Sequence, residues 1–262
     1  PISLAMPMSE ARKNVRTNLI NSVMEVVQYN EAHQNSDLSF FEISKVYAKE
    51  KEDERLAIVL DGSVESDRLH RYEIPGDFYA LKGIILTWLS RYGFAGSRIA
   101  VKENTMDTEH FHPYRSAEIY LDRKLLGVFG ELHPDYAKKF DCKRVCYAEL
   151  SIEPVLNAKT GRIRFTELPK FPSVSRDIAL VVDGSVTAGE ILKTARNSGA
   201  KILVDCEVFD VYEGEHVAEG QKSVALTLTY QTDHTLRDEE ITEAHEKILN
   251  NLKKKLNAEL RG

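Results

Sequence analysis

The sequence predicts an α+β protein in two parts, an antiparallel sheet with flanking helices and then a small βαββαβ domain. Two observations near the C-terminus define the small domain most clearly. Ile178, Leu180 and Val182 alternate with other residues, which is the period of a half-buried strand. A second pattern recurs at helical spacing, in Ile241, Ala244, Ile248, Leu252 and Leu256. Strand-like and helix-like segments then follow one another in the order strand, helix, strand, strand, helix, strand.

Each element of the small domain has a local signal. Thr187 and Glu190 have capping-box spacing at the start of a helix that Gly199 ends. Thr235 and Asp238 mark the start of the second helix. The predicted strands cover residues 175–182, 201–212, 223–230 and 258–261. Because two helices can cover only one face of a four-stranded sheet, the other face stays open, and open sheet faces commonly bind single-stranded RNA.

The first part of the chain has the pattern of a larger antiparallel sheet with helices. Helices are expected at residues 9–32 and from Asp77 to about Tyr92, where Gly93 follows. Strands are expected at residues 38–47, 56–60, 99–101, 117–121, 125–130 and 145–150. Residues 157–172 are polar and contain Pro169 and Pro172, which predicts a boundary between domains at 1–160 and 165–262.

Composition is that of an ordinary globular chain. The 262 residues are 42% hydrophobic and 29% charged, with a net charge of −6. No stretch approaches the roughly 20 apolar residues of a membrane span, and no secretory signal is visible, so we expect no membrane partner. Three cysteines are an odd number in a chain of this size, which favours reduced thiols and a cytoplasmic location.

Three other constellations have some features of functional sites. Cys142 and Cys146 with His133 lack a fourth zinc ligand, and the His110–Phe111–His112 run lacks a third. Glu118 and Glu131 could be imagined as paired carboxylates, but nothing in the sequence places them in one cleft. We therefore expect no metal site, no catalytic residue and no bound cofactor in this segment.

Four motifs follow one another in the small domain: residues 171–179 (FPSVSRDIA), 209–212 (FDVY), 219–223 (EGQKS) and 235–240 (TLRDEE). Their order and spacing resemble the ferredoxin-fold anticodon-binding domain that closes the beta subunit of bacterial phenylalanyl-tRNA synthetase. The first part resembles the same subunit at residues 7–10 (PMSE), 14–19 (NVRTNL), 41–47 (FEISKVY), 77–83 (DFYALKG), 112–113 (HP), 127–130 (GVFG) and 132–134 (LHP). The resemblance covers nearly the whole chain and corresponds to the C-terminal third of a longer subunit.

The resemblance implies that residues 1–160 belong to a catalytic-like module built on the class II synthetase core. Class II ligases hold ATP phosphate with an arginine in an F-R-x-E strand and with a second arginine after a Gly-rich strand. Residues 40–43 read FFEI and residues 127–133 read GVFGELH, without either arginine. We therefore expect this module to be inactive, with adenylate chemistry, ATP and Mg²⁺ belonging to the whole enzyme and its catalytic alpha subunit in an α2β2 heterotetramer.

The resemblance further implies that the small domain binds the anticodon of phenylalanine tRNA through Asp210, Tyr212 and Ser223. Tyr212 can stack a base, Asp210 can accept from a guanine Watson–Crick edge, and Ser223 can donate or accept. Ser223 opposes the apolar parity of its strand and is expected to face outward. Asp210 and Tyr212 share the parity of apolar residues earlier in their strand, so either a bulge intervenes or the strand end leaves the helix-covered region.

Two rival interpretations stay open. The same βαββαβ order also serves regulatory modules that bind an amino acid, although no Gly-rich loop follows the first strand. The first part could instead be a purely structural scaffold for the alpha subunit. Charge bears on RNA binding, because residues 165–262 hold 12 lysines plus arginines against 17 aspartates plus glutamates, a net charge of −5. General RNA binders are usually basic, so we expect this domain to contribute selection more than affinity.

Overall fold

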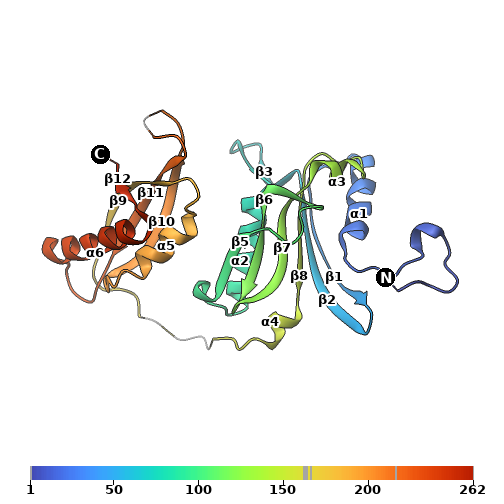
Figure 1. The fold of residues 1–262 in the computed structure, drawn as a ribbon, viewed down its shortest axis with the longest axis horizontal. Coiled ribbons are helices and arrows are strands. Elements are labelled where there is room, and N and C mark those ends of the chain that lie inside the picture. Colours follow the sequence, from blue (N-terminus) through green and yellow to red (C-terminus); the bar gives the residue numbers. More distant parts are fainter. Residues whose placement is uncertain (1, 162–164, 166, 216, 262) are drawn as a thin grey trace. The chain divides into compact units, whose positions relative to one another are not determined.

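The computed structural model describes residues 2–161, 165, 167–215 and 217–261 (Figure 1). The chain forms two compact units, Pro1–Arg164 and Phe165–Gly262, and each is described by itself. Both units combine helices with antiparallel strands, which confirms the predicted α+β class. The predicted boundary region, 157–172, includes residues 162–164 and 166, which lie outside the described residues.

A six-stranded antiparallel sheet forms the centre of the first unit, in the order β1-β2-β8-β7-β6-β5. Its strands lie at the predicted positions, with longer bounds. They are β1 (Leu38–Ala48), β2 (Lys51–Asp61), β5 (Ile99–Glu103), β6 (Phe111–Leu121), β7 (Lys124–Leu132) and β8 (Val145–Ser151). A separate hairpin of β3 (Ser63–Asp67) and β4 (Tyr72–Pro75) was not predicted, and most of its residues are exposed.

Helices cover both faces of this sheet. Helix α2 (Phe78–Arg91) packs on the face that presents Leu56, Ile58 and Leu60, and Asp77 caps it by accepting from the amides of Tyr79 and Ala80. Helix α1 (Ile20–Ala32) packs on the opposite face, against Ala57 and Val59. The remaining helical turns are short: η1 (Glu10–Arg12), η2 (Gly96–Arg98), α3 (Pro134–Lys138) and α4 (Glu153–Asn157).

The long helix predicted at residues 9–32 is wrong in its first half. The α-helix begins only at Ile20, because the backbone before it is used in other hydrogen bonds. Leu4 N donates to Lys13 O at 2.8 Å, and Val15 N donates to Ile2 O at 2.8 Å. Amides and carbonyls in such a bridge cannot also serve an i to i−4 helical ladder.

The second unit has the predicted order β9 (Val174–Asp183), α5 (Ala188–Arg196), β10 (Leu203–Tyr212), β11 (Gln221–Tyr230), α6 (Asp238–Leu256) and β12 (Glu259–Leu260). Its sheet has the order β10-β11-β9-β12, and α5 and α6 contribute Ile191, Ala195, Ile241 and Ile248 to one core (Figure 1). The register-paired residues of that core lie on one sheet face, so the other face is not covered by these helices.

The two helix starts of this unit had different outcomes. The Thr187–Glu190 capping box is confirmed, since Thr187 Oγ1 accepts from Glu190 N at 3.2 Å and Glu190 Oε2 accepts from Thr187 N at 2.8 Å. The second helix starts within the predicted region, but its N-cap is Arg237 and not Thr235. It begins at Asp238, because the Glu240 carboxylate bonds the amide of Arg237 at 3.0 Å and fixes the entry there.

A buried carboxyl at the end of β2 makes the stability of the first unit depend on pH. Asp61 is 6% exposed, and its Oδ2 has no hydrogen-bond partner in the described part of the chain. Burial, followed by the nearby charge of Glu31, raises the pKa of Asp61 from 3.8 to about 6. The folded state therefore holds this proton more tightly than the unfolded chain, and ionisation of Asp61 opposes folding as pH rises from about 4 to above 6.

We expect Asp61→Asn to stabilise the protein at pH 7 by about 1–3 kcal/mol, because an amide carries no charge to bury. The advantage shrinks as pH falls through 6 and vanishes below about 4, where Asp61 is protonated in both states. Denaturant unfolding across this pH range measures it, with the exposed neighbour Asp141→Asn as the matched control. An Asp61→Asn variant that is less stable than the parent at pH 7 would contradict this account.

Candidate nucleic-acid interface

A bulge in β10 decides which way Asp210 and Tyr212 face. Val208 pairs with Leu226 of β11, whereas Asp210 pairs with Ala225, so Phe209 is an extra residue on the β10 side. Before the bulge, Cys206 and Val208 point into the core, and after it the parity is reversed. The bulge therefore turns Asp210 and Tyr212 onto the open face. Of the two alternatives left open by the sequence, a bulge or a strand end beyond the helices, the structure shows the bulge.

The open face is built from cross-strand rows. One row runs through Tyr212, Ser223, Val181 and Glu259, and the next through Asp210, Ala225 and Ala179. The second row contains small side chains after Asp210, which leaves space above the sheet. Further along, Thr227 Oγ1 donates to Asp177 Oδ1 at 2.7 Å, so polar side chains continue across this face.

Tyr212 is held beside an arginine that sequence reasoning missed. Tyr212 is 38% exposed, and its hydroxyl donates to Glu215 O at 3.2 Å. Arg261 lies with its Cζ 5.3 Å from the centroid of that ring, and Arg261 N donates to Ala179 O at 2.9 Å. The backbone bond fixes Arg261 at the sheet edge, and the guanidinium makes a cation–π contact with Tyr212.

Ser223 has the expected register but not the expected exposure. It lies on the open-face side of its strand, as predicted, yet it is only 4% exposed because neighbouring side chains cover it. The reason is its place on the central strand, where this small side chain lies between the larger Tyr212 and Val181. Asp210, in contrast, is exposed, and no ion pair to it is found among the described residues.

The charges on the open face are mostly negative. Strand register places the carboxylates of Asp177, Asp205, Glu207, Asp210 and Glu259 on it. Arg261 follows β12 and is the guanidinium that reaches Tyr212. These charges disfavour a surface that binds the phosphate backbone of RNA without selectivity. They are more compatible with a site that stacks on bases and forms hydrogen bonds to base edges.

The alternative constellations are accounted for by other contacts. Cys142, Cys146 and Cys206 are buried free thiols, and burial raises their pKa values to about 12, 12 and 11. Glu118 accepts from Thr105 at 2.8 Å, whereas Glu131 binds two arginines, so these carboxylates do not form a pair. Within the described ranges, no group of three metal-binding side chains is found, and no helix is long and apolar enough to span a membrane.

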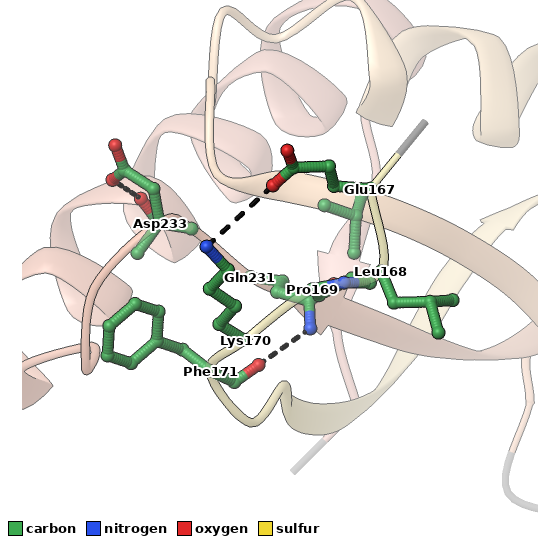
Figure 2. Close-up of a pocket in the computed structure, with 9 residues that line it drawn as sticks. Glu167, Leu168, Pro169, Lys170, Phe171, Gln231 and Asp233 are labelled. Atoms are coloured by element: carbon green, nitrogen blue, oxygen red, sulfur yellow. Dashed lines mark hydrogen bonds and ion pairs between the residues drawn. The ribbon is translucent and has the colours of Figure 1, made fainter. Parts of the chain in front are cut away.

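A shallow cavity of about 430 Å³ lies at the other end of β10, near Val204 (Figure 2). Figure 2 shows its polar groups bonded to one another: Lys170 lies 3.8 Å from Glu167, and Gln231 donates to Phe171 O at 2.9 Å. Its lining offers no converging donors for a ligand among the described residues. The open face around Tyr212 is therefore the better candidate site.

In the first unit, the strand that lacks the expected phosphate-binding arginine carries an internal ion pair. Arg16 Nη1 lies 3.2 Å from Glu42 Oε1 of β1, and Arg16 Nε donates to Lys45 O at 3.1 Å. On the same sheet face, the amide of Leu19 donates to Glu149 Oε2 at 3.0 Å. The chain's own N-terminal segment thus binds acceptor groups on this face of the sheet.

The fold and site define a two-module chain whose second module is a ferredoxin-like sheet with one open face. Residues 169–261 match the family described as "Ferredoxin-fold anticodon binding domain", and residues 1–152 match "Phenylalanyl tRNA synthetase beta chain CLM domain". The chain belongs to the phenylalanyl-tRNA synthetase beta-chain family.

Two sequence relatives agree with this assignment. The chain is 38% identical to the phenylalanine–tRNA ligase beta subunit of Bacillus subtilis over 99% of its length, and 39% identical to that of Geobacillus kaustophilus over 100%. In both cases it spans 33% of the relative's length. Among solved structures, a Desulfitobacterium hafniense pyrrolysyl tRNA synthetase aligns at 13% identity with a TM-score of 0.44, over 58% of this chain and 51% of that one.

Proposed function

We propose that this chain is the C-terminal part of the beta subunit of a phenylalanine–tRNA ligase, in which residues 165–262 bind the anticodon of phenylalanine tRNA. The bulge at Phe209 carries this proposal, because it turns Asp210 and Tyr212 onto the open sheet face beside Arg261. The resemblance in sequence named Asp210, Tyr212 and Ser223, and the local geometry gives two of them the access that base recognition requires.

Each group has a role that follows from its chemistry. An unstacked anticodon base stacks on the Tyr212 ring in place of the Arg261 guanidinium, which then lies over the far side of the base. The Asp210 carboxylate accepts from a guanine Watson–Crick edge, whose N–H groups the other bases do not present in that pattern. Ser223 is buried below this contact, so it supports the position of Tyr212 and meets a base only if the ring shifts.

Residues 1–160 form, on this proposal, a non-catalytic class II-like module that supports the alpha subunit. The internal ion pair between Arg16 and Glu42 supports this role, since it satisfies a carboxylate on the strand that would otherwise face a nucleotide. ATP and Mg²⁺ act in the whole α2β2 enzyme, where the alpha subunit carries out aminoacylation. The net charge of −5 in residues 165–262 fits a domain that selects tRNA more than it holds it.

We expect Arg261→Ala to weaken binding of a phenylalanine anticodon stem-loop by about 0.5–2 kcal/mol, because the base loses its second stacking partner. Arg261→Lys keeps the charge without the planar guanidinium and recovers only part of the loss. Fluorescence or calorimetric titration of the whole chain measures both, with Lys254→Ala at the C-terminal end of α6 as a cationic control. Equal affinity for the parent and Arg261→Ala would remove Arg261 from the site.

A further inference from the structure

A second surface, on the first unit, has the features of a nucleic-acid contact. It centres on a large bulge in β6, where Phe111 pairs with Leu132 and Ser116 pairs with Gly130, so four residues oppose Glu131 alone. We call these four residues, His112 to Arg115, the β6 bulge. Bulges of this kind re-aim side chains and occur often beside functional sites.

A glycine in the neighbouring strand β7 makes room for the β6 bulge. Gly130 has a φ of +149°, and a Cβ there would lie 2.4 Å from Arg115 O and 2.5 Å from Ser116 Cα. The Ser116 hydroxyl also donates to His112 O at 2.7 Å, which closes the bulge on itself. The loop is therefore held in one conformation by close backbone packing and an internal hydrogen bond.

A buried carboxylate pins two arginines at the base of the bulge. Arg115 Nε and Nη2 bind Glu131 Oε2 and Oε1 at 2.8 and 3.0 Å, and Arg144 Nε binds Glu131 Oε2 at 2.9 Å. Glu131 is buried, whereas both arginines are exposed. In the described part of the chain, no other carboxylate forms an ion pair with either arginine, so two guanidinium groups share one carboxylate.

Two histidines add fixed donors beside the arginines. His112 Nδ1 accepts from Tyr114 N at 3.1 Å, and His133 Nδ1 accepts from Asp135 N at 3.2 Å. Because each Nδ1 is an acceptor, each neutral ring carries its proton on Nε2. Burial, and then the charge of Arg115, lowers the pKa of His112, which keeps this ring neutral at pH 7.

An exposed aromatic ring lies beside one of these histidines. Tyr114 is 90% exposed, and its ring centroid lies 6.2 Å from that of His112. A tyrosine that is so exposed contributes little to folding. An exposed aromatic ring in the same bulge as a fixed guanidinium group is a combination that can bind an unpaired nucleotide, with the base on the ring and the phosphate on the cation.

We propose that the β6 bulge, with Arg144, is a second RNA-binding site, which stacks one unpaired nucleotide on Tyr114 and binds its phosphate through Arg115 and Arg144. The proposal rests on the proposed function only in taking RNA as the ligand. It is separate from the Tyr212 site, which belongs to the other unit. A purely structural ion pair around Glu131 would explain the arginines but not the exposed Tyr114.

The test uses the whole chain with Tyr212→Ala as background, so that the open sheet face is weakened, and a short unstructured RNA oligonucleotide as the probe. We expect Tyr114→Ala to weaken binding at least about fivefold, because one stacked base is lost. Tyr114→Phe keeps the ring and the affinity. Tyr79→Ala, which removes a 74% exposed tyrosine from α2, is the matched control and leaves binding unchanged.

Arg144→Gln tests the phosphate contact in the same titrations. We expect weaker binding and a salt slope that is smaller by about 0.7, the change for one single-strand phosphate. Glu131 keeps its ion pair with Arg115 in this variant. Thermal unfolding checks that the variant still folds. Inorganic phosphate and a nucleoside monophosphate are separate arms, and we expect the RNA to bind more tightly than either.

Three outcomes would overturn the proposal. The first is equal affinity in Tyr114→Ala, Tyr79→Ala and their parent. The second is phosphate that binds as tightly as RNA with no effect of Tyr114→Ala, which makes this an anion site only. The third is RNA binding that disappears with Tyr212→Ala alone, which leaves the anticodon proposal standing. Loss of oligonucleotide binding in Tyr114→Ala with no effect of Tyr212→Ala would support the second site, and the anticodon proposal is then decided by titration with the anticodon stem-loop.

Discussion

Replacing Tyr212 with alanine is expected to weaken binding of the phenylalanine anticodon stem-loop by about 1–3 kcal/mol, the contribution of one stacked base. Kd then rises by about 5-fold to about 150-fold. The change also removes the ring over which Arg261 lies at 5.3 Å, so both sides of the base contact are weakened at once. Titration of the whole chain at fixed salt measures the effect, since RNA affinity depends steeply on ionic strength.

Tyr212→Phe separates stacking from the rest of the side chain. It keeps the ring and loses the hydroxyl bond to Glu215 O, so we expect affinity close to that of the parent. Tyr79→Ala, on the first unit, controls for removal of an exposed tyrosine. If Tyr212→Ala and Tyr79→Ala bind the stem-loop equally well, base stacking on Tyr212 is not part of recognition.

Gly130→Ala is expected to destabilise the first unit by about 2–4 kcal/mol, through a backbone clash and an unfavourable φ together. The new Cβ would lie 2.4 Å from Arg115 O at a φ of +149°, and neither neighbour is the flexible end of a side chain. The β6 bulge must then shift away from β7. Chemical denaturation followed through Trp88, which packs against the core of the first unit, measures this loss.

Gly83→Ala is the matched control for this change. Gly83 lies inside α2 with nothing within 4 Å of a Cβ, so alanine there is expected to stabilise the helix by about 0.5–1 kcal/mol. The two variants should therefore change stability in opposite directions. A Gly130→Ala protein as stable as its parent would mean that β6 and β7 tolerate a wider separation than their register indicates.

Much of the second unit could be predicted because its signals are local. The alternation of Ile178, Leu180 and Val182 and the Thr187–Glu190 capping box depend on neighbouring residues, and the structure bears both out. The helix predicted at residues 9–32 failed because long-range backbone bonds to Ile2 and Leu4 took the place of helical ones. Apolar spacing alone cannot reveal such a competitor.

In the candidate site, too, some features follow from the local sequence and others depend on strand pairing. Sequence parity raised the conflict at Asp210, but only strand pairing located the bulge at Phe209 that resolves it. The burial of Ser223 depends on neighbours from two other strands, which parity does not describe. Arg261 could have been found, because the predicted strand at 258–261 places it on the face opposite Leu260, yet its distance from Tyr212 in the sequence hid the contact.

The most direct test of the central claim is an NMR titration of the isotopically labelled chain with two stem-loops, the phenylalanine anticodon loop and one with a changed first anticodon base. We expect the resonances of Asp210, Tyr212 and Arg261 to shift with the first and to shift far less with the second. Equal shifts with both loops, or no shift at these residues with either loop while other residues respond, would contradict anticodon recognition at this face.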